Sequence, residues 1–436
     1  MRIRNIIEID FIILFAVIGL AVIGVLFIYS SGISSHASFI STEYRRQMVW
    51  VSFGLIMALA IAVLNYKRIY DLSIYFYLGT IALLVITLLL GRFMHGTRWL
   101  RIGGFGIQAS EFAKIATILF LAWYLDSRRR DKGALIRFVV SCIIVTLPMI
   151  LILLQPDLGT ALVFIPVLMG MVYIAGLPIR YIAFLGLCIA LSGVLLVLPL
   201  WQTAIMNNSI PVLMGLVNAR IVIAACLTLA LIMAISAFGF LRFKKSYFYW
   251  ISYFASIFIF SLGASFLAGR TLREYQLMRL IVFINPNVDP RGFGWQIIQS
   301  TTAIGSGGAF GKGFLQGTQS HYHFLPEQST DFIFSILSEE WGFIGGVLLF
   351  ALFLIILLRL IRIMRITNDS FGSYIVAGLV SMYAFHFIVN VGMTMGIMPI
   401  TGIPLMFVSY GGSAMLSAMM GIGLAFSVHV RRYSQS

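Results

Sequence analysis

The stretch that decides the fold runs from Asp331 to Leu358 and reads DFIFSILSEEWGFIGGVLLFALFLIILL. Its second half is a continuous apolar run, and its first half carries the carboxylates of Asp331, Glu339 and Glu340. A helix that crosses a bilayer needs about 20 mostly apolar residues. The stretch therefore predicts a membrane-spanning helix. Carboxylates are costly in lipid, so all three are functional candidates.

The rest of the chain repeats this apolar pattern. Of its 436 residues, 60% are hydrophobic and 10% are charged, whereas soluble domains average about 25% charged residues. The mean hydropathy is +1.00. We expect an all-α polytopic membrane protein with about 12 transmembrane helices and no soluble appendage. The predicted spans are residues 9–31, 47–65, 70–91, 111–125, 136–154, 158–177, 180–199, 218–240, 248–268, 331–358, 373–393 and 405–429.

The positions of Lys and Arg predict how these spans are oriented, because short cytoplasmic loops are enriched in both. Alternate loops carry most of the basic residues, which places both termini in the cytoplasm. The basic residues of the opposite loops have two readings: long loops translocate regardless of charge, or these loops meet an anionic ligand. The net charge of +15 fits cytoplasmic loops that lie on anionic membrane lipid. The basic residues form no continuous patch, so the sequence does not predict a nucleic-acid partner.

One outer segment, residues 269–330, is far longer than ordinary connections between helices, which usually marks function or disorder. Its many aromatic and aliphatic residues argue against disorder. Residues 271–284 predict an interfacial amphipathic helix, and Asn285-Pro286 ends it.

The ionisable residues within the spans allow more than one role. Asp331 either caps a helix dipole or acts as a proton acceptor. Glu111 and Lys114 are i,i+3 neighbours that either neutralise each other, or act separately, with Lys114 meeting substrate phosphate and Glu111 holding a cation or an acid group. Asp157 lies where Pro156 and Gly159 break a helix, and we expect a structural role for it.

Three further charged residues belong to the long outer segment and the span after it. Glu339 and Glu340 lie deep enough in that span to need partners, and we assign them structural roles. Lys312 lies in the glycine-rich run Gly305–Gly313, which could present backbone N–H groups to an anion. As a phosphate-binding motif this run is weak, since it departs from the P-loop pattern.

Several motifs occur in a characteristic order along nearly the whole chain. They include Thr97-Arg98-Trp99, Ser110-Glu111 with Lys114, Gln155–Thr160, Asn285–Pro290, Gly311-Lys312-Gly313, Gly317-Thr318-Gln319, Leu325-Pro326-Glu327, Thr330–Phe334, Gly402–Leu405 and Ser409–Ser413. The chain thereby resembles the SEDS family (shape, elongation, division and sporulation), and within it the RodA branch.

This resemblance implies a peptidoglycan glycosyltransferase of the cytoplasmic (inner) membrane. Such enzymes polymerise lipid II into glycan strands on the outer face during cell elongation, together with a class B penicillin-binding protein that crosslinks them. The resemblance implies that Asp331 is catalytic, and that Glu111, Lys114 and Arg98 bind substrate. Lys312 and Glu327 lie in matching motifs and are further candidate substrate contacts. A divalent cation, Mg²⁺ or Mn²⁺, is a candidate cofactor whose ligands the sequence does not identify.

The chain departs from the family in one respect, because RodA proteins usually have ten spans. We expect a single membrane domain over residues 1–436, in which residues 218–268 are an inserted helix pair. The alternative function is a lipid II flippase. A transporter would place its charges at the bilayer midplane on broken, repeated helices, whereas here they gather toward one face without an internal repeat.

Overall fold

The computed structural model describes residues 9–33, 41–94, 98–102, 105–131, 133–202, 211–322 and 324–432. The chain forms two compact units, one of Met1–Leu177 with Gln296–Ser436 and one of Pro178–Trp295. Arg2 and Arg4, which support the predicted cytoplasmic N-terminus, lie outside the described residues. The single domain over residues 1–436 stays a prediction.

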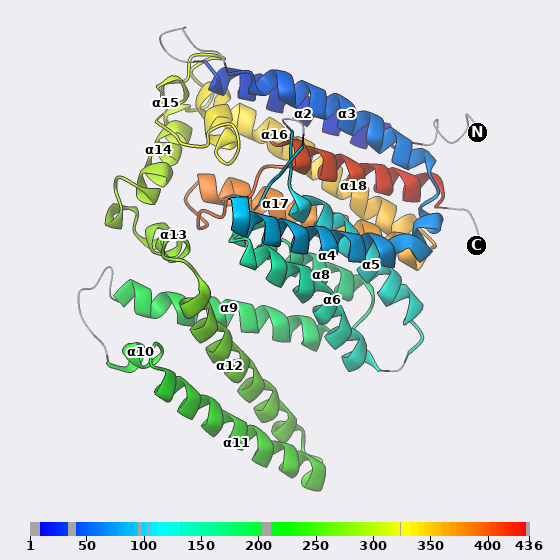
Figure 1. The fold of residues 1–436 in the computed structure, drawn as a ribbon, viewed down its shortest axis with the longest axis vertical. Coiled ribbons are helices and arrows are strands. Elements are labelled where there is room, and N and C mark those ends of the chain that lie inside the picture. Colours follow the sequence, from blue (N-terminus) through cyan, green and yellow to red (C-terminus); the bar gives the residue numbers. More distant parts are fainter. Residues whose placement is uncertain are drawn as a thin grey trace. The chain divides into compact units, whose positions relative to one another are not determined.

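The larger unit is a bundle of apolar helices with one short hairpin (Figure 1). Its helices are α2 (Phe11–Ser31), α3 (Glu43–Val63), η1 (Tyr66–Arg68), α4 (Ile69–Met94), α5 (Ala109–Ser127), α6 (Ala134–Leu154), α7 (Leu158–Leu162), α8 (Phe164–Ile174), α15 (Thr318–His321), α16 (Ile333–Ile366), α17 (Ser370–Thr394) and α18 (Gly412–Val430). The strands β1 (Leu100–Ile102) and β2 (Phe105–Ile107) pair antiparallel, with Leu100 opposite Ile107.

The centre of this bundle is formed by α17 and α18, which bury most of their residues. Helix α17 packs against α5, α8 and α16, and α18 packs against α3 and α5. A helix that is apolar on all sides and enclosed by other helices needs specific partners for each polar side chain it carries. The polar residues of α17 and α18 are therefore the ones that position the site.

The described part of the chain contains ten helices that are long and apolar enough to cross a membrane. The other two of the twelve predicted spans correspond to α5 and to the pair α7 and α8, which together cover Leu158–Ile174. The fold is the all-α polytopic membrane protein that the sequence predicts.

The predicted helix break near residue 156 is confirmed. Helix α6 ends at Leu154 and α7 begins at Leu158, with Asp157 as its N-cap. By contrast, the span predicted to open at Asp331 begins two residues later, at Ile333. Asp331 therefore lies in the turn before α16 and not in the helix itself, so the helical repeat does not determine whether its side chain shares a face with that of Glu339.

Helix α16 is interrupted at Gly342, whose φ of 62° and ψ of −158° are not helical. A break inside a helix leaves backbone groups that need other partners. Residues 308–313 supply them. Phe343 and Ile344 donate their N–H groups to the carbonyls of Gly308 and Ala309, while Glu339 and Glu340 accept from the N–H groups of Lys312 and Gly313.

The smaller unit contains the predicted extra helix pair as α11 (Ala219–Phe243) and α12 (Ser246–Thr271), which pack as an antiparallel hairpin (Figure 1). Its other elements are α9 (Ile179–Trp201), α10 (Pro211–Gly215), α13 (Glu274–Ile284) and η3 (Pro286–Val288). Helix α13 matches the predicted amphipathic helix and ends at Ile284, with Asn285 as its C-cap. Helix α14 (Phe293–Ser306) begins in this unit and ends in the larger one.

Candidate functional site

A buried ion pair lies at the beginning of α5. The Nζ atom of Lys114 is 2.9 Å from Oε2 and 3.0 Å from Oε1 of Glu111. Both side chains are at most 3% exposed. The hydroxyl of Ser417 on α18 donates to Glu111 at 3.0 Å. Because both charges are removed from water, loss of one partner would leave the other charge buried and uncompensated.

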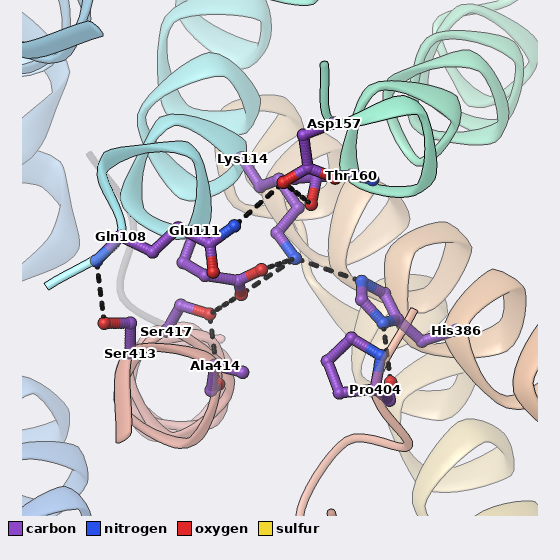
Figure 2. A network of polar contacts seen from close by, with 10 residues as sticks. All are labelled: Gln108, Glu111, Lys114, Asp157, Thr160, His386, Pro404, Ser413, Ala414 and Ser417. Carbon is purple, nitrogen blue, oxygen red and sulfur yellow. Dashed lines mark hydrogen bonds and ion pairs between the residues drawn. The ribbon is translucent and has the colours of Figure 1, made fainter. Parts of the chain in front are cut away.

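A histidine that the sequence reasoning missed completes this pair. His386 on α17 is 1% exposed, and its Nε2 lies 3.1 Å from Nζ of Lys114. Its Nδ1 lies 3.0 Å from the carbonyl oxygen of Pro404, so Nδ1 carries the proton and Nε2 accepts from Lys114. Figure 2 shows the Lys114 ammonium between the Glu111 carboxylate and the His386 ring. We call Glu111, Lys114 and His386 the ammonium cluster.

The α6–α7 break lies beside this cluster (Figure 2). Asp157 accepts from the side-chain amide of Gln108 at 2.9 Å and from the backbone and hydroxyl of Thr160 at 3.2 and 3.0 Å. Arg98 donates from Nε to the carbonyl of Gln155 at 3.1 Å and from Nη2 to the carbonyl of Pro156. Arg98 thus contacts the two carbonyls just beyond the C-terminus of α6, where a cation is favoured.

The turn that carries Asp331 is held through its backbone. The Asp331 N–H donates to the carbonyl of Glu327 at 3.0 Å, and the Asp331 carbonyl accepts from the side-chain amide of Asn390 at 3.0 Å. Ser409 donates to the carbonyl of Thr330 at 2.5 Å. These contacts fix the position of the Asp331 backbone, while its side chain remains partly accessible.

Two neighbouring polar residues of α17 connect the Asp331 turn to the ammonium cluster. His386 and Asn390 are four residues apart, so they lie on one face of the helix. His386 donates to the carbonyl of Pro404, and Asn390 donates to the carbonyl of Ile403 at 2.8 Å. The loop of residues 402–411 is therefore fixed by the same helix face that holds Lys114 and the Asp331 backbone.

A second ion pair lies near the break in α16. Lys312 and Glu339 are 2.7 Å apart, and their side chains are 27% and 0% exposed. The same Glu339 oxygen accepts from the N–H groups of Thr318 and Gln319, at 2.9 and 3.1 Å. Glu340 accepts from the N–H of Leu315 at 3.0 Å and from the hydroxyl of Ser30. These contacts hold residues 312–319, just before and at the beginning of α15, against α16. We call the hydrogen bonds and the ion pair of Glu339 and Glu340 the clasp.

The structure thus brings some of the predicted site residues together in two separate ion pairs. Glu111 and Lys114 form a pair, and Lys312 pairs with Glu339. The glycine-rich run does not present all its amides outward, because Lys312 and Gly313 donate theirs to α16. Glu327 is exposed and adopts a left-handed φ of 50°. The sequence does hold a sign of His386, because it is an ionisable residue inside an apolar span. The polar side chain of Asn390 four residues later strengthens that sign.

Among the described residues, no group of three or more His, Cys, Asp or Glu side chains could hold a metal ion. Mg²⁺ is often held by one or two carboxylates and completed by water and substrate phosphates. A protein site for the predicted Mg²⁺ or Mn²⁺ therefore has at most two such ligands in this part of the chain.

These features define a class of protein, a multi-pass helical membrane protein whose spans enclose a carboxylate, an ammonium and an imidazole. The family of cell cycle proteins FtsW, RodA and SpoVE matches residues 11–209 and 199–434. The chain belongs to this family, the SEDS family that its motifs resemble.

Known relatives match over most of their length. The chain is 48% identical to the peptidoglycan glycosyltransferase RodA of Treponema pallidum (strain Nichols), over 99% of this chain and 100% of that protein. It is 31% identical to the peptidoglycan glycosyltransferase MrdB of Escherichia coli (strain K12), over 89% of this chain and 86% of that protein. A solved chain from a peptidoglycan synthase complex that coordinates polymerization and crosslinking is 26% identical, with a TM-score of 0.65 over 98% of this chain and 99% of that one.

Proposed function

We propose that this protein is a peptidoglycan glycosyltransferase that polymerises lipid II into glycan strands. The observation that carries the proposal is the shared frame of α17 and the 402–411 loop, which holds the Asp331 turn and the ammonium cluster together. A carboxylate and a cation in one fixed frame suit a transfer that removes a proton at one point and develops negative charge at another. The names of the relatives point to the same reaction.

Asp331 is the general base of this reaction. The 4-hydroxyl of the acceptor sugar attacks C1 of the donor, its proton passes to the Asp331 carboxylate, and a new oxygen–C1 bond forms. The bond from C1 to the undecaprenyl pyrophosphate breaks, and the pyrophosphate leaves with the electron pair. Because attack and departure occur on opposite faces, the configuration at C1 inverts.

Lys114 and Arg98 stabilise the departing pyrophosphate. An ammonium has three N–H donors, and here they face the two Glu111 oxygens and the His386 ring, so a substrate oxygen takes the place of one of these acceptors. Since Lys114 is 1% exposed, substrate reaches it only when the surrounding helices open. Lys312 and Glu327 contact the substrate further out, where their side chains are accessible.

The proposed location is the cytoplasmic (inner) membrane, with both termini in the cytoplasm and the Asp331 turn on the outer face. The positions of Lys and Arg support this orientation. A class B penicillin-binding protein is the proposed partner in cell elongation, supported by the similarity to a chain from a peptidoglycan synthase complex. Co-purification of this protein with that transpeptidase from detergent-solubilised membranes would test the pairing.

Mg²⁺ or Mn²⁺ is the proposed cofactor and would be held jointly by a carboxylate and substrate oxygens. Polymerisation should then stop when EDTA is added and recover when Mg²⁺ or Mn²⁺ is restored. Full activity of extensively chelated enzyme would remove the ion from the proposal.

The decisive experiment measures polymerisation of labelled lipid II by the purified protein and by its Asp331→Asn variant. We expect a loss of about 10²–10⁴-fold, which is the usual contribution of a general base, with an unchanged melting temperature. Asp131→Asn is the matched control, because Asp131 forms only an exposed ion pair with Arg128. Wild-type activity of Asp331→Asn would refute the assignment.

The flippase alternative makes a different prediction in the same preparation. It expects labelled lipid II to cross a liposome bilayer without forming polymer. The proposed function expects polymer from the wild-type protein, whether or not translocation occurs. Translocation by a protein that forms no polymer would favour the flippase.

A further inference from the structure

The smaller unit contains a cavity of about 190 Å³ that none of the proposed catalytic steps uses. Side chains of α9 and α12, the turn before α11, and Leu277 of α13 form its walls. Most of these walls are aliphatic, as in Leu196, Leu200 and Leu216. The cavity is smaller than the roughly 300–1,000 Å³ of pockets that enclose whole drug-sized ligands. It therefore suits a segment of a hydrocarbon chain.

One charged side chain lines this apolar cavity. Arg270 lies in the last turn of α12, and its guanidinium carbon is 4.4 Å from the centroid of the Phe266 ring. Stacking on an aromatic ring leaves the N–H groups at the edge of the guanidinium available to an anion. No ion pair among the described residues includes Arg270.

The surroundings of Arg270 reinforce its charge. Helices α11 and α12 form an antiparallel hairpin, so Arg220 at the beginning of α11 lies at the same end of the hairpin. Arg273, the N-cap of α13, follows three residues after Arg270. A favourable interaction of Arg270 with the helix dipole explains a cation at this end, but it does not explain an adjoining apolar cavity.

We propose that this cavity binds an anionic phospholipid of the surrounding bilayer. Arg270 donates paired hydrogen bonds to the lipid phosphate, which matches the planar geometry of a guanidinium. The first part of one acyl chain fills the cavity between α9 and α12. Helices α11 and α12 thereby acquire a lipid-binding role that is independent of glycan synthesis.

Two variants separate the two halves of this site. Arg270→Gln removes the charge and leaves the cavity. Gly269→Leu fills the cavity and keeps the charge, because a Cβ at Gly269 meets only Leu196, at an ordinary contact distance of 3.6 Å. Arg220→Gln is the matched control, since it removes an exposed arginine at the same end that does not line the cavity.

The experiment uses the full-length protein, delipidated in a neutral detergent and titrated separately with dioleoyl phosphatidylglycerol and dioleoyl phosphatidylcholine. Native mass spectrometry gives the affinity of the first lipid bound, and a melting curve checks the fold of each variant. We expect the wild type and Arg220→Gln to prefer phosphatidylglycerol by about tenfold, because the choline ammonium of phosphatidylcholine offsets the phosphate charge that Arg270 binds. Arg270→Gln should lose this preference, and Gly269→Leu should bind both lipids more weakly.

Other outcomes overturn the proposal. A folded Arg270→Gln that keeps its preference for phosphatidylglycerol refutes the role of Arg270. An unchanged affinity in a folded Gly269→Leu refutes the acyl-chain site. If Arg220→Gln loses as much preference as Arg270→Gln, the attraction is a general effect of surface charge. Because lipid II is absent, failure here is distinct from failure of the proposed enzyme activity.

Discussion

The larger unit contains two Lys–Glu pairs that differ in what surrounds them. Glu339 accepts hydrogen bonds from the backbone N–H groups of Thr318 and Gln319 as well as from Lys312. Among the residues that the structure describes, Glu111 accepts from two side chains, those of Lys114 and Ser417. The Glu339 carboxylate is hydrogen-bonded to the backbone of a distant loop, whereas the Glu111 carboxylate lies among side chains of separate spans.

This difference suggests different purposes for two chemically similar pairs. A carboxylate that satisfies backbone donors of a loop is costly to lose, because those donors have no other partner. A carboxylate among side chains can exchange partners when helices move. We infer that the Glu339 carboxylate maintains the fold and that the ammonium cluster serves the reaction.

The largest expected effect tests the structural half of this comparison. Glu339→Ala removes the acceptor of the Thr318 and Gln319 amides and the carboxylate partner of Lys312, which keeps only the Thr318 hydroxyl. It should destabilise the protein by about 3–5 kcal/mol. Thermal unfolding in detergent measures this loss. Lys312→Met should cost less, since the Lys312 side chain is 27% exposed. Equal stability of wild type and Glu339→Ala would show that the clasp is dispensable.

The next effect tests the functional half. The double variant Glu111→Gln with Lys114→Met removes both charges at once, so no unpaired charge is left buried. We expect a nearly normal melting temperature and a fall in lipid II polymerisation of about 10²–10³-fold, as for loss of one group that stabilises developing charge. The comparison fails if this variant unfolds as readily as Glu339→Ala, or if it polymerises normally.

A smaller effect concerns His386, which links the ammonium cluster to the 402–411 loop. His386→Leu removes the acceptor for Lys114 and the donor to Pro404, and should cost about 1.5–3 kcal/mol of stability. His386→Gln retains an amide that can accept from Lys114 and should recover part of this loss. Melting temperatures of the two variants, measured side by side, give the difference. Identical values for both variants would mean that the polar contacts of His386 contribute nothing.

The smallest effect concerns residues 308–313, the loop that is hydrogen-bonded across the break in α16. Gly308 has a φ of +55°, and a Cβ there would meet no atom within 4 Å. Gly308→Ala should therefore cost only the strain of a left-handed residue, about 1–2 kcal/mol. Gly305→Ala is the control, because Gly305 has equally open space without a positive φ. A melting temperature of Gly308→Ala no lower than that of Gly305→Ala would mean that the loop relaxes without cost.

The sequence predicted most of the fold because each span is a long apolar run with its own boundaries. The pair predicted at 218–240 and 248–268 is found as Ala219–Phe243 and Ser246–Thr271. The break near Pro156 also followed from local chemistry. The break at Gly342 did not, because glycines are common in membrane helices and only the contacts with residues 308–313 show that this one is left-handed.

The candidate site was predictable in part for a similar reason. Glu111 and Lys114 are close in sequence, so their spacing brings them together in any helix. Lys312 and Glu339 are separated by a loop, and no local rule gives their contact. His386 reaches Lys114 across a helix interface. Such partners depend on how helices pack, which residue spacing within one segment does not encode.

The break in α16 has a mechanical consequence. Residues 308–313 form four backbone hydrogen bonds across it, and the side chains of Glu339 and Glu340 hold the adjoining residues 315–319. Detaching either part would leave buried amides and carboxylates without partners. The first turns of α16 and this loop are therefore expected to move together as one rigid body. Asp331 lies at its end, so a displacement of the loop would carry the proposed base with it.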